Sequence, residues 1–220
     1  MHDYMENMQH EVVIPCEKVY LDGLLYIPQK ARGMIIFAHG SGSSRFSSRN
    51  QAIAKKLQYA GFATLLFDLL TSVEDQRDET TAEYRFNIKL LASRLLAVTN
   101  WLLTHSILKK LPIGYFGAST GGGAALLAAA QSQNIIKAIV SRGGRPDLAG
   151  DALANVKAAT LLIVGGDDDV VIQLNKTAFA QLHCEKELTI IPGATHLFEE
   201  PGKLDEVSCL AEDWFVRFLF

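Results

Sequence analysis

The sequence has few cysteines, little net charge and no pattern typical of a metal ribbon or a nucleic-acid-binding protein. Its three cysteines, Cys16, Cys184 and Cys209, are far apart, and no CxxC occurs. A disulfide framework or zinc ribbon is therefore not expected, and a reducing compartment fits. With 21 basic and 24 acidic residues the net charge is −3. The chain has no excess of basic residues that could bind a phosphate backbone, so we expect no nucleic-acid partner.

Signals for export and for membrane insertion are also missing. Residues 1–11 are polar and acidic, unlike a signal peptide. The uncharged stretch 111–136 is interrupted by Pro112 and several glycines, so it predicts a buried strand, a turn and a helix rather than a bilayer span. We expect a cytoplasmic protein without a membrane partner. Because 49% of its residues are hydrophobic and only 20% charged, the chain should fold as one domain over residues 1–220.

Short apolar runs alternate with helical patterns along most of the chain. Most of the runs are apolar at both odd and even positions, as in strands buried on both faces of a parallel sheet. The expected strands are 12–15, 19–27, 34–38, 63–67, 113–116, 135–140, 160–164 and 188–191, and the expected helices are 48–59, 82–105, 120–131, 174–182 and 204–218. This alternation predicts an α/β fold with a mostly parallel, doubly wound sheet of about eight strands flanked by helices. The first two strands resemble an antiparallel edge. The polar segment 71–81 is expected to be a solvated connection, with a small flap as the alternative.

The residues from Gly117 to Gly121 form a G-x-S-x-G pattern centred on Ser119. The pattern follows a predicted strand and opens a predicted helix, which is the context of a nucleophile elbow. A glycine-rich turn that serves only packing is the alternative, whereas phosphate binding is disfavoured because neither G-x-G-x-x-G nor GK[ST] is present. Gly122 and Gly123 continue into the helix, and either close packing or room for a substrate would explain them.

A serine nucleophile needs a base and a group that orients the base. His196 follows the last predicted strand and precedes the last helix, so it lies at the sheet edge where ligands bind. Asp167, Asp168 and Asp169 follow the strand 160–164, and all three are candidate orienting acids. A metal loop is disfavoured because the aspartates do not have EF-hand spacing. The chain order of serine, aspartate and histidine is that of α/β-hydrolases.

The loop after the strand 34–38 is a candidate oxyanion loop. An oxyanion hole needs one backbone N–H after the nucleophile and one from this loop, and we assign these to Thr120 and Ser41. His39 is expected to hold the loop by hydrogen bonds, although a contact with substrate is open to it. We expect no cofactor and no metal ion.

Two arginines follow the strand that ends near residue 140. Arg142 and Arg145 could clamp a carboxylate or phosphate of the substrate. They could equally form structural ion pairs with Asp147 or with the aspartate cluster, and we favour this second interpretation. Arg45 and Arg49, after the oxyanion loop, carry the same two alternatives.

With these motifs the chain resembles the dienelactone hydrolase-like group of α/β-hydrolases. The resemblance covers residues from about 34 to the end and is carried by AHGSGSSRFSSRN, GYFGASTGGG, SRGGRPDLAG, LLIVGGDDDVV and PGATHLFEEPG. Similar small bacterial hydrolases occur alone or fused to phosphoribosyltransferase-like domains. The family pattern G-x-x-D-x-x-V falls on Gly165, Asp168 and Val171, which selects Asp168, while the family's histidine and nucleophile fall on His196 and Ser119.

The resemblance implies hydrolysis of carboxylic esters. No cap domain fits in 220 residues, so we expect an open site. Dienelactone hydrolases proper have a cysteine nucleophile where this chain has Ser119, so the resemblance does not extend to dienelactone as the substrate. We therefore predict a serine hydrolase that cleaves a small ester through an acyl-enzyme. The alternatives are a thioesterase or peptidase with the same residues, or a non-catalytic binding module on the same fold. The sequence leaves the oligomeric state open.

Overall fold

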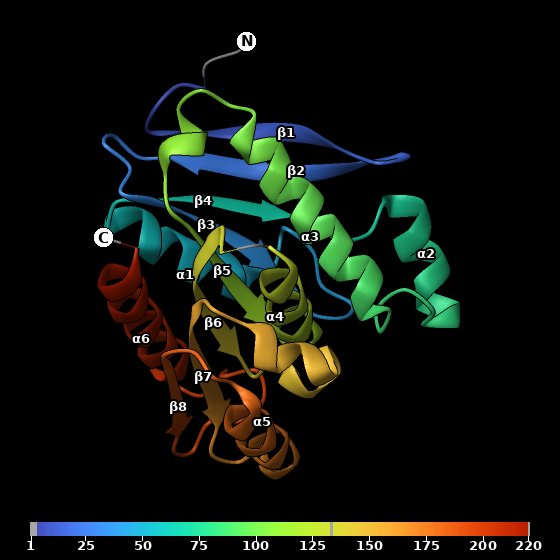
Figure 1. Cartoon of the computed structure of the whole chain (residues 1–220), viewed down its shortest axis with the longest axis vertical. Helices are drawn as coiled ribbons and strands as arrows, with labels where there is room; N and C mark the ends of the chain where they lie inside the picture. Colours follow the sequence, from blue (N-terminus) through green and yellow to red (C-terminus); the bar gives the residue numbers. More distant parts are fainter. Residues whose placement is uncertain (1–3, 133, 220) are drawn as a thin grey trace.

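The computed structural model describes residues 4–132 and 134–219 and has a single eight-stranded sheet at its centre (Figure 1). The strand order is β1-β2-β4-β3-β5-β6-β7-β8. β2 pairs antiparallel with both β1 and β4, and all other neighbours are parallel. The strands are β1 (Met8–Cys16), β2 (Val19–Ile27), β3 (Gly33–Ala38), β4 (Phe62–Phe67), β5 (Ile113–Ala118), β6 (Ile136–Arg142), β7 (Ala159–Gly165) and β8 (Lys186–Ile191). The predicted fold class, including the antiparallel edge, is confirmed.

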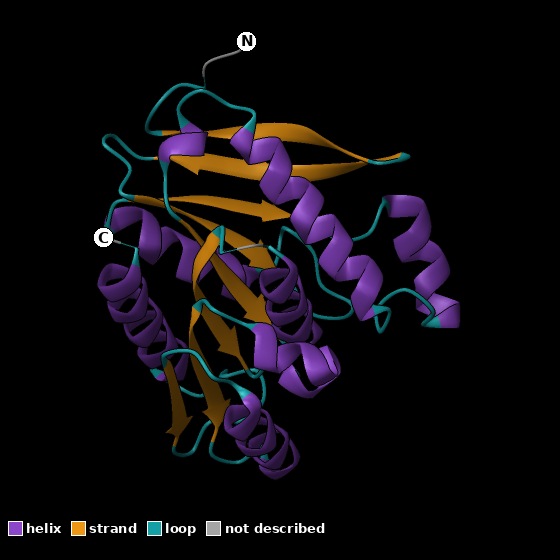
Figure 2. Ribbon diagram, viewed as in Figure 1, coloured by secondary structure: helices purple, strands orange, loops and turns teal. Residues whose placement is uncertain are grey.

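Helices cover both faces of the sheet (Figure 2). They are α1 (Ser48–Tyr59), α2 (Ser72–Thr81), α3 (Ile88–Leu103), α4 (Thr120–Gln131), α5 (Asp169–Gln181) and α6 (Lys203–Phe218), with short 3₁₀ segments at η1 (Leu108–Lys110) and η2 (Pro146–Asn155). α1 and α6 pack on one face through one hydrophobic cluster, while α3 and α4 contribute to a second cluster on the other face. β3, β4, β5 and β7 are buried at every position, as their continuous apolar runs predict.

The segment predicted as a solvated connection is the helix α2, so that prediction is wrong. Its sequence, SVEDQRDETT, has no apolar stripe, and Asp78 is its one buried residue. Polar contacts stabilise it instead: Thr71 and Glu74 form a capping box, and the Glu74 carboxylate accepts hydrogen bonds from Arg94 of α3. Hydrophobic periodicity carries no signal for a helix held in this way.

The following helix also begins later than expected, at Ile88 rather than residue 82. Ala82 ends α2 in the left-handed conformation. The buried Asp78 carboxylate then accepts the N–H groups of Tyr84 and Arg85 and the Nε–H of Arg85. These bonds hold residues 82–87 as a turn above the carboxyl ends of the strands. None of the helices in residues 4–132 and 134–219 has the length and apolar character needed to cross a bilayer.

Candidate active site

Ser119 lies between β5 and α4 in a strained backbone conformation. Its φ of 51° and ψ of −122° lie where non-glycine residues are rare. The glycines on either side leave no room for a side chain: a Cβ on Gly121 would lie 2.1 Å from the Ala38 carbonyl oxygen, and one on Gly117 would lie 2.6 Å from the Gly121 carbonyl oxygen. The G-x-S-x-G spacing is therefore a steric requirement of the turn that carries the serine.

Gly122 and Gly123 are explained by close packing rather than by room for a substrate. A Cβ on Gly122 would lie 2.5 Å from the Ser141 hydroxyl oxygen of β6. A Cβ on Gly123 would lie 2.6 Å from the Arg145 carbonyl oxygen. The two glycines let α4 approach β6 and the chain that follows it, and this contact holds the first turn of α4 behind Ser119.

The structure brings Ser119, His196 and Asp168 together at the carboxyl ends of β5, β8 and β7. His196 Nδ1 lies 2.6 Å from Asp168 Oδ2, and His196 Nε2 lies 3.4 Å from the Ser119 hydroxyl oxygen. A carboxylate at Nδ1 favours the tautomer with its proton there, which leaves Nε2 free to accept the serine proton. The bond to Ser119 is long, as catalytic hydrogen bonds often are before substrate binds.

Asp168 is the aspartate that contacts His196, although two others adjoin it. Asp167 uses its backbone N–H to bind the Ala194 carbonyl, and Asp169 is the first residue of α5. Among the described residues, neither of these two carboxylates has a hydrogen-bond partner. Asp168 is also the N-cap residue of α5, yet its side chain makes no capping bond. Its carboxylate accepts a hydrogen bond from His196 instead.

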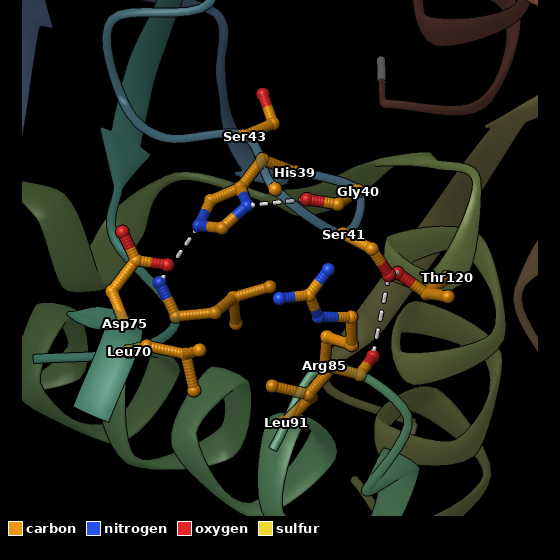
Figure 3. Close-up of a pocket in the computed structure, with 11 residues that line it drawn as sticks. His39, Gly40, Ser41, Ser43, Leu70, Asp75, Arg85, Leu91 and Thr120 are labelled. Atoms are coloured by element: carbon orange, nitrogen blue, oxygen red, sulfur yellow. Dashed lines mark hydrogen bonds between the residues drawn. The ribbon is translucent and has the colours of Figure 1, made fainter. Parts of the chain in front are cut away.

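Ser41 and Thr120 lie side by side next to the nucleophile. Their hydroxyl oxygens are 3.1 Å apart (Figure 3), and the Ser41 hydroxyl also donates to the Arg85 carbonyl at 3.5 Å. Within residues 4–132 and 134–219, neither the Ser41 nor the Thr120 amide N–H has an acceptor. A Cβ on Gly40 would lie 3.0 Å from Ser119 Cβ, so this loop passes close over the nucleophile. Two unpaired amides at this place can receive a developing oxyanion, helped by the N-terminus of α4.

His39 is buried and holds the loop. Its Nδ1–H donates to the Gly40 carbonyl at 2.9 Å, and its Nε2 accepts the Leu69 N–H at 2.9 Å (Figure 3). Burial lowers its pKa, so the ring is neutral at physiological pH. Both ring nitrogens are used within the protein, which matches the expected loop-holding role and leaves neither nitrogen for a substrate.

The two arginines after β6 have different surroundings. Arg145 forms a two-point ion pair with Asp147, with Nε–Oδ1 at 2.8 Å and Nη2–Oδ2 at 2.7 Å, as favoured from the sequence. For Arg142 the prediction of a structural ion pair is wrong. Arg142 is 6% exposed, and its Nε and Nη1 have no hydrogen-bond partner among the described residues. Burial and the positive charge of Arg49 lower its pKa to about 10, so it remains charged at neutral pH.

A cavity of about 170 Å³ lies against Ser119 and His196. Arg142 lines it, together with Arg49 and Asn50 from the first turn of α1. Arg49 is a candidate from its place after the oxyanion loop, but nothing in the sequence indicates Asn50, a polar residue on the buried side of α1. In the part of the chain that the structure describes, no group of three or more His, Cys, Asp or Glu is placed to hold a metal ion.

Comparison with known proteins finds a matching family model and similar folds. The model of the family described as "Dienelactone hydrolase family" matches residues 21–219. A crystal structure of dienelactone hydrolase from Anabaena variabilis has 54% sequence identity and a TM-score of 0.95, over 97% of this chain and 99% of that one. Est1E from Butyrivibrio proteoclasticus shares the fold, with 18% identity and a TM-score of 0.80 over 94% of this chain and 98% of that one.

A curated relative is longer than this chain. A Mycobacterium tuberculosis H37Rv protein named provisionally as a phosphoribosyl transferase is 56% identical over 209 residues, which are 95% of this chain and 46% of that protein. The chain thus spans about half the length of the curated relatives it matches.

Proposed function

Because the chain belongs to the dienelactone hydrolase family, and is thus a hydrolase acting on esters, we propose that it cleaves a small carboxylic ester through an acyl-enzyme on Ser119. The observation that carries the proposal is the position of His196 between Ser119 and Asp168, with one ring nitrogen toward each. In this proposal residues 1–220 form one catalytic domain. The longer relatives do not assign a second activity to this chain.

The proposed reaction has two acyl-transfer steps. His196 Nε2 takes the Ser119 proton as the hydroxyl oxygen attacks the ester carbonyl carbon. The amides of Ser41 and Thr120 stabilise the oxyanion, and His196 then protonates the departing alcohol. Water, deprotonated by His196, attacks the acyl carbon, and the acid leaves as Ser119 recovers its proton. Asp168 holds the imidazole in the required tautomer and stabilises its charged form throughout.

Replacement of the nucleophile tests this proposal. Ser119→Ala should lower kcat for 4-nitrophenyl acetate by about 10⁴-fold or more, because the covalent route is lost. Ser93→Ala is the matched control, since Ser93 is exposed on α3 and its hydroxyl donates to the Leu90 carbonyl within the same helix. A fluorophosphonate probe should label the wild type and Ser93→Ala but not Ser119→Ala.

A folded Ser119→Ala protein that keeps more than a tenth of wild-type activity would remove Ser119 from this role. No labelling of the wild type would instead favour a binding module. Activity on thioester or amide panels that exceeds activity on the ester panel would shift the proposal to a thioesterase or a peptidase, which share the same acyl-transfer route.

A further inference from the structure

Arg142 is a buried charge, and two of its nitrogen atoms, Nε and Nη1, have no hydrogen-bond partner among the described residues. It is the last residue of β6, and its carbonyl accepts the Ser119 N–H at 3.2 Å, so its backbone is fixed next to the nucleophile. Its guanidinium carbon lies 6.0 Å from the ring centroid of Phe198, a weak contact that leaves the Nε and Nη1 hydrogens without acceptors. Burying a charge without a hydrogen-bonded partner is costly. A buried, unpaired charge next to the nucleophile therefore indicates a group that binds a ligand.

The surroundings of Arg142 add positive charge rather than compensating for it. Arg49 lines the same cavity, and its Nε is also buried without a partner among the described residues. The Arg49 Nη1 donates to Glu199, which is largely exposed. No aspartate or glutamate is among the described residues that line the cavity. The cavity therefore presents guanidinium N–H groups without partners among the described residues, and the positive charge of Arg142 next to Ser119 and His196 is not offset by a carboxylate in its lining.

Such a cavity fits an anion. Guanidinium groups bind carboxylates and phosphates through paired N–H bonds, and these bonds are stronger in a partly buried site than in water. Asn50 is buried, and its Oδ1 has no partner within residues 4–132 and 134–219, so its amide can turn to offer N–H donors as well. All three side chains would gain from the same ligand.

We propose that this cavity is a subsite for an acidic group, a carboxylate or a phosphate, on the ester substrate, bound by Arg142 with support from Arg49. The proposal rests on the proposed function for the reacting centre. It narrows the substrate class to esters with an acidic group a few bonds from the scissile carbonyl, because Arg142 ends β6 and Ser119 directly follows the adjacent strand β5. β5 and β6 pair Ala118 with Arg142, so the backbone of Arg142 lies about one strand spacing from the residue that precedes Ser119.

A matched pair of substrates tests the subsite. Mono-4-nitrophenyl glutarate carries a free carboxylate, and its methyl ester is the neutral counterpart. Wild type should favour the anionic ester in kcat/KM by about tenfold or more, the usual effect of a charged hydrogen bond. Arg142→Gln should bring the ratio close to one, and Arg142→Lys should keep part of it. Arg145→Gln, which removes a guanidinium already paired with Asp147, should leave the ratio unchanged.

Equal kcat/KM values for the two esters in the wild type would overturn the proposal, as would a preference that survives in Arg142→Gln. If Arg142→Gln fails to fold, Arg49→Gln provides the test, because it should lower the same ratio.

Binding without turnover separates this inference from the proposed function. Glutarate and inorganic phosphate are titrated into Ser119→Ala by calorimetry, and the tighter of the two identifies the acidic group. The Kd should rise about tenfold when Arg142→Gln is added. Binding that depends on Arg142, with neither ester hydrolysed by the wild type, would support the subsite and refute the esterase. Failure of both anions to bind would refute the subsite whatever the esterase activity.

Discussion

Replacing Asp168 by asparagine preserves the shape of the side chain but removes the carboxylate that lies 2.6 Å from His196 Nδ1. An amide can present its N–H group to Nδ1, which then becomes the acceptor and forces the proton to Nε2. That tautomer cannot take the Ser119 proton. In the best-studied serine hydrolase the corresponding change lowers kcat by about 10⁴-fold. At about 1.36 kcal/mol for each factor of ten, this loss corresponds to about 5.4 kcal/mol of transition-state stabilisation.

Two neighbouring variants serve as controls for Asp168→Asn. Asp167→Asn changes a carboxylate that has no hydrogen-bond or ion-pair partner among the described residues, and kcat should stay within about tenfold of wild type. Asp169→Asn removes a charge from the first turn of α5, which should cost about 0.3–1 kcal/mol of stability with little loss of rate. Asp168 makes no capping bond, so Asp168→Asn should fold normally.

Steady-state kinetics on the three variants, with circular dichroism as the folding control, measures the difference. The reasoning is refuted if Asp168→Asn is folded and within about tenfold of wild type while Asp167→Asn or Asp169→Asn is inactive. If all three are active, the group that orients His196 lies outside this turn.

Two further predictions concern the length of the acyl chain and α2. The cavity beside Ser41 and Thr120 (Figure 3) is about 10 Å³, room for about one water, so it cannot hold a long acyl chain. We therefore expect that kcat/KM does not climb steadily from acetyl to dodecanoyl esters, and a steady climb would contradict this. Burial opposes ionisation of Glu74, but hydrogen bonds from Arg94 and Thr71 outweigh it and lower its pKa below 4.5. Glu74→Gln should therefore lower the free energy of unfolding by about 1–3 kcal/mol at pH 7, and the difference from wild type should shrink as the pH falls below 4.5, where Glu74 becomes protonated. Urea titrations of wild type and Glu74→Gln, at pH 7 and at a pH below 4.5, measure the difference in unfolding free energy. A difference that does not change with pH would contradict the assigned role of the ionised Glu74 carboxylate.

The parts of this protein that could be predicted from sequence are those with local causes. Strands buried on both faces are apolar at every position, so the core of the sheet can be read from short runs such as MIIFA. The elbow is only partly local: a Cβ on Gly117 would clash with Gly121 of the same turn, whereas a Cβ on Gly121 would clash with the Ala38 carbonyl at the end of β3. His196 and the aspartates could be placed because each follows a strand, and parallel strands end at one edge of the sheet. Hydrophobic periodicity did not predict α2, because its ten residues are held by the Thr71–Glu74 capping box and by Arg94 from a separate helix.

The sequence by itself determined the α/β fold and the residue types at each strand end, because burial, turn sterics and chain order act on neighbouring residues. Only the tertiary structure decided which side chains meet. It brought Asp168, the aspartate that the family pattern selects, against His196. It also paired Arg145 with Asp147, whereas the Nε and Nη1 of Arg142, in the cavity beside Ser119, have no hydrogen-bond partner among the described residues. The two arginines are three residues apart and chemically identical, so no local pattern distinguishes them. Their surroundings differ because Arg142 ends a strand and is buried in the lining of the cavity, whereas Arg145 lies in the chain beyond the strand, two residues from its partner.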